Sequence, residues 1–211
     1  MPVSLRLVLP FMLLPFMLLS ASPVAAVTFQ DCTKVQMDYI AGAVKSAQKL
    51  SLRAAAAVGD SEDYARWFGT YSRGNAERVR RTLKSIDHAL GSDQMRAVCA
   101  RTGYSGCDYG TYANVIPDRP YNINLCEAFF RMPTLMSMVP GSEEHQSGTR
   151  EGTLIHEMSH FSVVGATNDE CYTRDVCTDM AAGDPRRAII NADSYQYFAE
   201  DTVRYLAPVV K

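Results

Sequence analysis

The stretch GTLIHEMSHFSVVGATNDECY, residues 152–172, decides how the rest of this sequence is interpreted. It contains the pattern HExxH, formed by His156, Glu157 and His160. On a helix, residues four apart lie on one face a turn apart, so the two imidazoles can bind one metal ion. Zinc is the usual metal, and a catalytic zinc takes three protein ligands and keeps one position for water. Glu157 would lie beside that water and could act as its general base.

Apolar residues around HExxH predict that its helix is buried. They are Leu154, Ile155, Met158 and Phe161. The alternative is that the two histidines are ordinary helix residues that bind no metal. Two histidines at this spacing, with a glutamate directly after the first, favour a metallopeptidase over that alternative.

The pattern itself does not name a third ligand. No histidine follows at the spacing that the longer metzincin pattern requires, and His145 lies upstream in a polar loop, where a surface histidine is expected. Asp169 follows His160 by nine residues, after a segment in which Gly165 allows the chain to reverse. A carboxylate oxygen is an ordinary zinc ligand. Spacing alone leaves Asp169 equally suited to a turn or helix-cap role.

Composition limits the class of protein. The chain has 211 residues, of which 47% are hydrophobic, and its formal net charge is −2. These values predict one folded domain and argue against a disordered chain. They also argue against a nucleic-acid partner, because nucleic-acid binders usually carry a clear basic excess. We expect a monomer.

Residues 1–26 have the pattern of a secretory signal peptide, with Arg6 before an apolar run and small residues up to Ala26. The alternative is a membrane anchor, because the run is borderline in length for spanning a bilayer. Pro10, Pro15 and the small-residue exit favour cleavage. We therefore expect residues 27–211 to form one secreted domain, extracellular or periplasmic, with no stable membrane association after cleavage.

Six cysteines follow residue 26, and in an oxidising compartment they should be paired. They are Cys32, Cys99, Cys107, Cys126, Cys171 and Cys177.

Periodicity predicts a mainly α chain with a small β-hairpin or ribbon, an α+β fold. Residues 31 to about 98 have helical spacing of apolar residues, with Ser61 or Asp63 as an N-cap within them. Residues 99–140 are rich in Gly, Tyr, Asn and Pro, and contain the extended pieces TYANVI and YNINLC around a turn. Helical spacing returns from Gly152.

Several segments together resemble the deuterolysin-like aspzincins, and within them the peptidyl-Lys metalloendopeptidase branch. The segments are GTLIHEMSHF, GATNDECY, NADSYQYFAED, RWFGTY and CDYGTYANVIPDRPYNINLCEAFF. The resemblance covers essentially the whole chain after residue 26. It implies a zincin-like fold, one zinc ion per chain, and protein or peptide substrates.

The resemblance also implies site residues. His156, His160 and Asp169 fall on the zinc ligands and Glu157 on the general base. Tyr172 falls on the family tyrosine that donates to the oxyanion. Where the family has a Gly-Thr turn, this sequence has Gly-Ala-Thr, at residues 165–167.

The sequence departs from the family in the substrate pocket. There an Asp and, three residues later, a Glu bind the lysine just after the cut bond, whereas this chain has Asp193 and Gln196. Because one of two charges is missing, we expect a preference for Lys that is relaxed. Gln196 can still accept a hydrogen bond from an ammonium group. The alternative role for Asp193 is a helix N-cap, and we expect Glu200 and Asp201 at a solvated helix end.

The resemblance implies the disulfides Cys32–Cys99 and Cys107–Cys126. Cys171 and Cys177 are then left to pair, and would brace the loop that carries Asp169 and Tyr172. Two other functions stay open: an exported zinc amidohydrolase acting on cell-wall or other amide bonds, and a catalytically idle zinc-fold binding protein. Glu157 argues against the second, because a binding protein has no need of a general base.

Overall fold

The computed structural model describes residues 27–204, with side chains to residue 202, so the predicted signal peptide lies outside the described residues. Within that range, no helix combines the length and apolar character needed to cross a membrane. In chain order, the elements are β1 (Thr28–Gln30), α1 (Lys34–Ala57), α2 (Glu62–Phe68), α3 (Arg73–Leu90), β2 (Arg96–Ala100), β3 (Ala113–Val115), β4 (Asn122–Cys126), the 3₁₀ turn η1 (Phe129–Arg131), α4 (Glu143–Ser147), α5 (Arg150–His160), α6 (Arg174–Gly183), α7 (Pro185–Ala188) and α8 (Ala192–Arg204).

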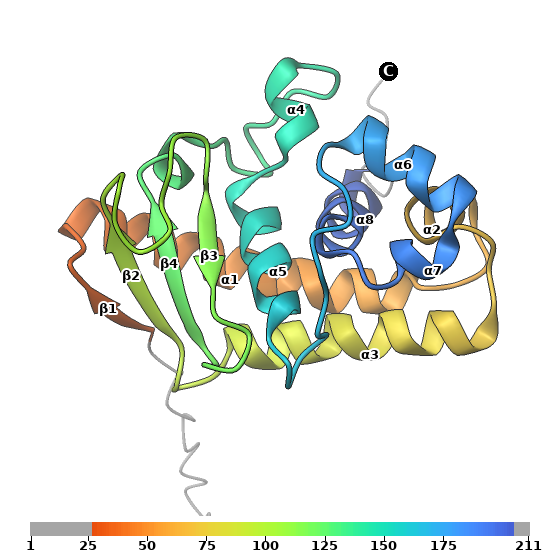
Figure 1. Ribbon diagram of the computed structural model, residues 1–211, viewed down its shortest axis with the longest axis horizontal. Coiled ribbons are helices and arrows are strands. Elements are labelled where there is room, and N and C mark those ends of the chain that lie inside the picture. The colour runs from red at the N-terminus through yellow and green to blue at the C-terminus, as the bar shows by residue number, and fades with distance from the viewer. Residues whose placement is uncertain (1–26, 205–211) are drawn as a thin grey trace, which may run out of the picture.

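The strands form one small sheet at one end of the molecule, in the order β1-β2-β4-β3 (Figure 1). Strands β3 and β4 are antiparallel, which confirms the predicted hairpin. Strands β1 and β2 were not predicted. They pair in parallel with each other, and β2 pairs in parallel with β4. Pieces this short show too few alternations of burial to be recognised as strands.

The long helices α1 and α3 pack against each other, and α1 also contacts α5 and α8. Ser61 is the N-cap of α2, as one of the two predicted candidates, and its hydroxyl accepts a hydrogen bond from the Tyr64 amide at 3.2 Å. Phe68 packs edge-on against Tyr195 and Phe198, with ring centroids 5.2 Å apart in each pair. This aromatic cluster fixes α2 on α8.

Helix α5 carries HExxH and lies between strand β3 and the segment that leads to α6 (Figure 1). The predicted burial is confirmed, because Leu154, Ile155, Met158 and Phe161 are all 0% exposed. Helix α8 approaches α5 closely at Gly152, where a Cβ would lie 2.0 Å from Glu200 Oε1. Glycine at this position therefore permits the contact between the two helices.

Two expectations for α8 are wrong. Asp193 is not the N-cap, because α8 begins at Ala192. Glu200 and Asp201 are not solvated, since they are 0% and 6% exposed. The reason is that α8 packs against α1, α2, α5 and α6, and Arg174 from α6 pairs with both carboxylates.

Three disulfides join the pairs Cys32–Cys99, Cys107–Cys126 and Cys171–Cys177. The first links the chain before α1 to strand β2, and the second links the loop before β3 to β4. The third closes a short loop beside the metal-binding residues.

Candidate metal centre

The predicted ligands converge on one point. His156 Nε2 and His160 Nε2 are 3.1 Å apart, and Asp169 Oδ1 lies 3.1 Å from the first and 3.3 Å from the second. Tetrahedral ligands about 2.0 Å from a zinc ion are separated by about 3.3 Å. The three atoms therefore have the spacing that a single zinc ion requires.

Hydrogen bonds to the other ring nitrogens orient both histidines. His156 Nδ1 donates to Asp193 Oδ1 at 2.6 Å, and His160 Nδ1 donates to the Thr167 carbonyl at 2.9 Å. Each Nε2 is then an acceptor, which is the tautomer that binds metal. Three acceptor atoms in mutual contact repel one another unless a cation or a proton lies among them, so the donor set fits a zinc ion.

Charges around His156 agree with this geometry. Burial lowers the pKa of its imidazole, but the neighbouring Asp169 and Asp193 carboxylates outweigh burial and raise the pKa well above its ordinary value. Burial in turn raises the pKa of Asp169, but the adjacent imidazoles of His156 and His160 bring it below its usual range. The site therefore favours a positive charge at its centre.

Glu157 lies beside the ligand cluster, with Oε1 4.0 Å from His156 Nε2. Its side chain is 7% exposed. Burial raises the pKa of this carboxyl, and the two nearby imidazoles lower it in part. A raised carboxyl pKa suits a general base, because the base must also release its proton near neutral pH.

The loop from Ser162 to Thr173 returns the chain to the site. Gly165 is required by close approach, since a Cβ would lie 2.7 Å from the Ser159 carbonyl. The left-handed residue of this turn is the next one, Ala166, with φ of 48°. The turn brings Asp169 back beside His156 and His160.

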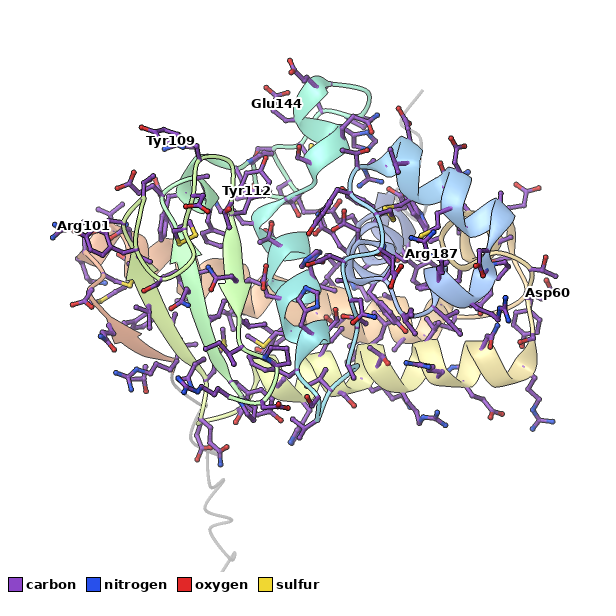
Figure 2. All side chains as sticks on the ribbon, in the orientation of Figure 1. Asp60, Arg101, Tyr109, Tyr112, Glu144 and Arg187 are labelled. Atoms are coloured by element: carbon purple, nitrogen blue, oxygen red, sulfur yellow. A yellow bond between two sulfur atoms is a disulfide. The ribbon has the colours of Figure 1, made fainter. Side chains whose placement is uncertain are left out.

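Several contacts brace the loop after Asp169. Asn191 Oδ1 accepts hydrogen bonds from the amides of Glu170 and Cys171 at 2.9 and 3.1 Å. The Glu170 carboxylate pairs with Arg187 of α7 at 2.8 Å, and Figure 2 labels Arg187 beside this loop. Asn191 has no recognisable signal in the sequence, because its role is to bind backbone amides, and a buried asparagine leaves no periodic pattern.

Tyr172 is 58% exposed and faces the same centre. Burial and the neighbouring Asp169 carboxylate raise the pKa of its hydroxyl to about 12. The hydroxyl therefore stays protonated at neutral pH and can donate a hydrogen bond.

A cavity of about 430 Å³ opens over the ligands. Residues 110–115, on the loop before β3 and on β3 itself, form one wall of this cavity. Figure 2 shows that Tyr112 faces inward, whereas Tyr109 projects outward. The other end is lined by Ser147, Thr153, Asp193, Gln196 and Tyr197. Gln196 Nε2 donates to the Ser147 carbonyl at 3.2 Å. Asp193 therefore contacts His156 and also lines the cavity with Gln196.

The family model described as lysine-specific metallo-endopeptidase, the aspzincins, matches residues 53–200. An extracellular protease of Aeromonas hydrophila is 31% identical over 183 residues, which cover 84% of this chain and 48% of that protein. A peptidyl-Lys metalloendopeptidase of Pleurotus ostreatus is 32% identical over 179 residues, which cover 82% of this chain and 96% of that protein. The chain thus spans about half of the first relative and nearly all of the second.

A solved zinc peptidase from Grifola frondosa has a similar fold. Its TM-score is 0.68 at 26% identity, and the match covers 81% of this chain and 97% of that chain. The predicted α+β metallopeptidase fold is confirmed by this match.

Proposed function

Because the chain belongs to the lysine-specific metallo-endopeptidase family, the aspzincins, we propose that it is an exported zinc endopeptidase that prefers Lys just after the cut bond. The observation that carries the proposal is the convergence of two oriented imidazoles and one carboxylate beside a buried glutamate. Zinc, when bound, supplies Lewis-acid polarisation and lowers the pKa of water.

Side chains of this protein carry out the proton transfer, stabilise the oxyanion and bind the metal. Glu157 takes a proton from the attacking water and can later pass it to the leaving amine. Tyr172 donates to the carbonyl oxygen as that atom gains negative charge. His156, His160 and Asp169 hold the metal, and Asp193 keeps His156 in the tautomer that binds it.

A polypeptide substrate is supported by the cavity wall. Strand β3 is at the end of the sheet order, and among the described residues β4 is its strand partner. Residues 110–115 line the cavity, so an extended peptide could pair with this edge while crossing the ligands. A strand edge of this kind favours a peptide over the other amide substrates considered.

Cleavage of casein tests the activity. We expect cleavage that a chelator abolishes, that zinc restores, and that Glu157→Gln reduces by about 100-fold or more. The zinc content of Glu157→Gln, measured by plasma mass spectrometry, should equal that of the wild type. Zinc binding with no cleavage would favour the idle binding protein. Hydrolysis of cell-wall amides without casein cleavage would favour the amidohydrolase.

The Lys preference rests on Asp193 and Gln196, which line the cavity beside the ligands. Asp193 supplies one negative charge, although its Oδ1 is already bonded to His156. Gln196 supplies a neutral amide where the family has a carboxylate. A long cationic side chain would meet one charge and one polar group, which supports a preference for Lys weaker than two charges would give.

Mass spectrometry of fragments from a denatured protein tests this preference. We expect Lys to be enriched directly after the cut bond, and Gln196→Glu to sharpen the enrichment. Gln94→Glu, the same charge change at an exposed position, should leave it unchanged. Fragments with no enrichment of Lys in the wild type would refute the preference while leaving the peptidase assignment intact.

Export is supported by the sequence of residues 1–26, and the Aeromonas relative is named as extracellular. Mass measurement of the protein secreted by an expressing bacterium should give a chain that begins at Val27.

A further inference from the structure

Arg174 is a buried cation outside the metal centre. It is the first residue of α6 and is 5% exposed. Nη1 donates to Asp201 Oδ1 at 2.7 Å, Nη2 to Glu200 Oε2 at 2.5 Å, and Nε to the His145 carbonyl at 2.8 Å. The guanidinium also lies over the Tyr197 ring, 4.5 Å from its centroid. These contacts hold the start of α6 on α8 from several directions.

Glu200 continues this network to the helix that carries HExxH. Its Oε1 accepts hydrogen bonds from the Thr149 amide at 2.8 Å and from the Thr149 hydroxyl at 2.7 Å. Thr149 is the N-cap of α5, and its hydroxyl oxygen accepts from the Gly152 amide at 3.0 Å. A continuous set of buried polar contacts therefore joins Arg174 to the start of α5.

Tyr172 is two residues before Arg174 and depends on its neighbours for its position. Its side chain is 58% exposed, so packing around the ring can fix it only in part. On one side, Cys171 is buried and bonded to Cys177. On the other side, Thr173 has φ of 68° and ψ of 153°, a conformation that residues other than glycine adopt only when the surroundings impose it.

We propose that Arg174 is a positioning residue, which holds Tyr172 in register with the HExxH helix through Glu200 and Thr149. The inference rests on the proposed function, in which Tyr172 donates to the developing oxyanion. Arg174 is not among the residues that line the cavity over the ligands, so it does not act on substrate itself. It directly follows the strained turn at Thr173, and the Glu200 carboxylate that binds it also binds Thr149, the N-cap of the helix carrying Glu157.

A double-mutant cycle separates positioning from general stabilisation. Arg174→Lys keeps the charge, but one ammonium group cannot reproduce the planar, multiply bonded guanidinium. We expect kcat to fall about 10- to 100-fold, because small displacements of a reacting group have effects of this size, with KM and zinc content within about twofold. In a Tyr172→Phe background, Arg174→Lys should cause almost no further loss.

The matched control is Arg73→Lys. Arg73 also pairs with a carboxylate, Glu77 at 3.1 Å, but its side chain is 89% exposed and lies on α3. Its kcat should equal that of the wild type. An equal fold-loss from Arg174→Lys in the wild-type and Tyr172→Phe backgrounds would overturn the proposal, as would a change confined to KM.

Hydrogen exchange of the zinc-free protein gives a readout independent of activity. In Arg174→Lys, the amides of Thr149 and Cys177 should exchange at least several-fold faster, because they donate to Glu200 and to the Thr173 carbonyl. Amides within α1 and α3 should keep their protection. Faster exchange everywhere, or no change at Thr149 and Cys177, would contradict the proposal.

Arg174→Met is a second variant for the same measurements, in case the lysine of Arg174→Lys makes the same contacts as the arginine. Arg174→Met should show the same local pattern with larger amplitude, provided that α1 and α3 remain protected. If the wild type cleaves no peptide, the proposed function fails, while the exchange pattern still decides whether Arg174 couples the two segments.

Discussion

The metal centre is built from two regions of different character. His156, Glu157 and His160 lie on helix α5, where backbone hydrogen bonds set the spacing of side chains. Asp169 and Tyr172 lie on an irregular loop, where no repeating pattern sets position. The loop is instead held by hydrogen bonds to Asn191, by the Cys171–Cys177 disulfide and, directly after its end, by the Arg174–Asp201 ion pair.

This difference shows that the loop needs more supporting contacts than the helix to position its side chains. The helix positions three functional groups by its own geometry and needs one cap and a buried face. The loop positions two groups and uses contacts from α6, α7 and α8 to do so. Substitutions in the loop and in the residues that contact it should therefore show which contacts position the site and which stabilise the fold.

Tyr172→Phe should have the largest effect. Loss of one oxyanion donor typically lowers kcat by about 100- to 1,000-fold. Zinc content should stay at the wild-type value, because Tyr172 is not among the three converging ligands. Steady-state kinetics and metal analysis on one preparation check both parts. Loss of zinc, or unchanged turnover, would remove Tyr172 from this role.

Glu200→Gln should change how stability depends on pH. Burial raises the pKa of Glu200 from 4.5 to about 7, with Arg174 opposing the rise. An acid with a raised folded-state pKa stabilises the fold fully below about pH 4.5 and loses that contribution as pH rises through about 7. The wild type should therefore lose on the order of 3 kcal/mol relative to Glu200→Gln between pH 4 and 8. Urea unfolding across this range measures the difference, and parallel curves would contradict it.

Asp193→Asn tests the carboxylate that binds His156, one of the two helix-borne ligands. Such partners typically contribute 10- to 100-fold to metal affinity, so zinc affinity in a competition titration should fall by about that factor. Asp118→Asn is the control, because Asp118 binds the exposed Ser162 outside the ligand cluster. Unchanged zinc affinity in Asp193→Asn would limit Asp193 to the substrate cavity.

The Cys32–Cys99 disulfide and the loop disulfide Cys171–Cys177 should differ in what they affect. Replacing Cys171 and Cys177 by Ser should lower the free energy of unfolding by about 2 kcal/mol and kcat by up to about 10-fold. Replacing Cys32 and Cys99 should cost about 4 kcal/mol, because that loop is longer, with kcat unchanged. Chemical denaturation and kinetics on both variants distinguish the two. Equal effects on kcat would argue against a positioning role for the loop disulfide.

Thr173→Gly should have the smallest effect. Glycine adopts the positive φ of this position without the cost of a Cβ, so the free energy of unfolding should rise by about 1 kcal/mol. Thermal unfolding by circular dichroism measures the change. A lower free energy of unfolding would show that the Thr173 side chain contributes more than its backbone conformation costs.

The helix-borne part of the site could be predicted from the sequence, since HExxH and the apolar residues around it follow the period of one helix. Asp169 and Tyr172 could be predicted only through family resemblance, because loop spacing alone left Asp169 undecided. The family was likewise predicted from resemblance, whereas the α+β fold was predicted from the periodicity of apolar residues; the family match and the Grifola structure confirm both.

The buried charges could not be predicted. Glu200 and Asp201 follow an apolar run, and charged residues there are normally solvated. Their burial depends on Arg174, which lies 26 residues before Glu200 and meets it only when α6 packs beside α8. The parallel strands were not predicted for a related reason. Their partners lie far away in sequence, so local sequence patterns do not indicate the pairing.

The pairing of β1 with β2 also bears on how the chain folds. Thr28 lies opposite Arg96, and the two segments are joined through α1, α2 and α3. Parallel contacts between distant segments form slowly, because the intervening chain must be ordered before they contribute. The first strand therefore cannot enter the sheet until the whole helical half has been synthesised. Until then, β1 lacks the strand with which it pairs.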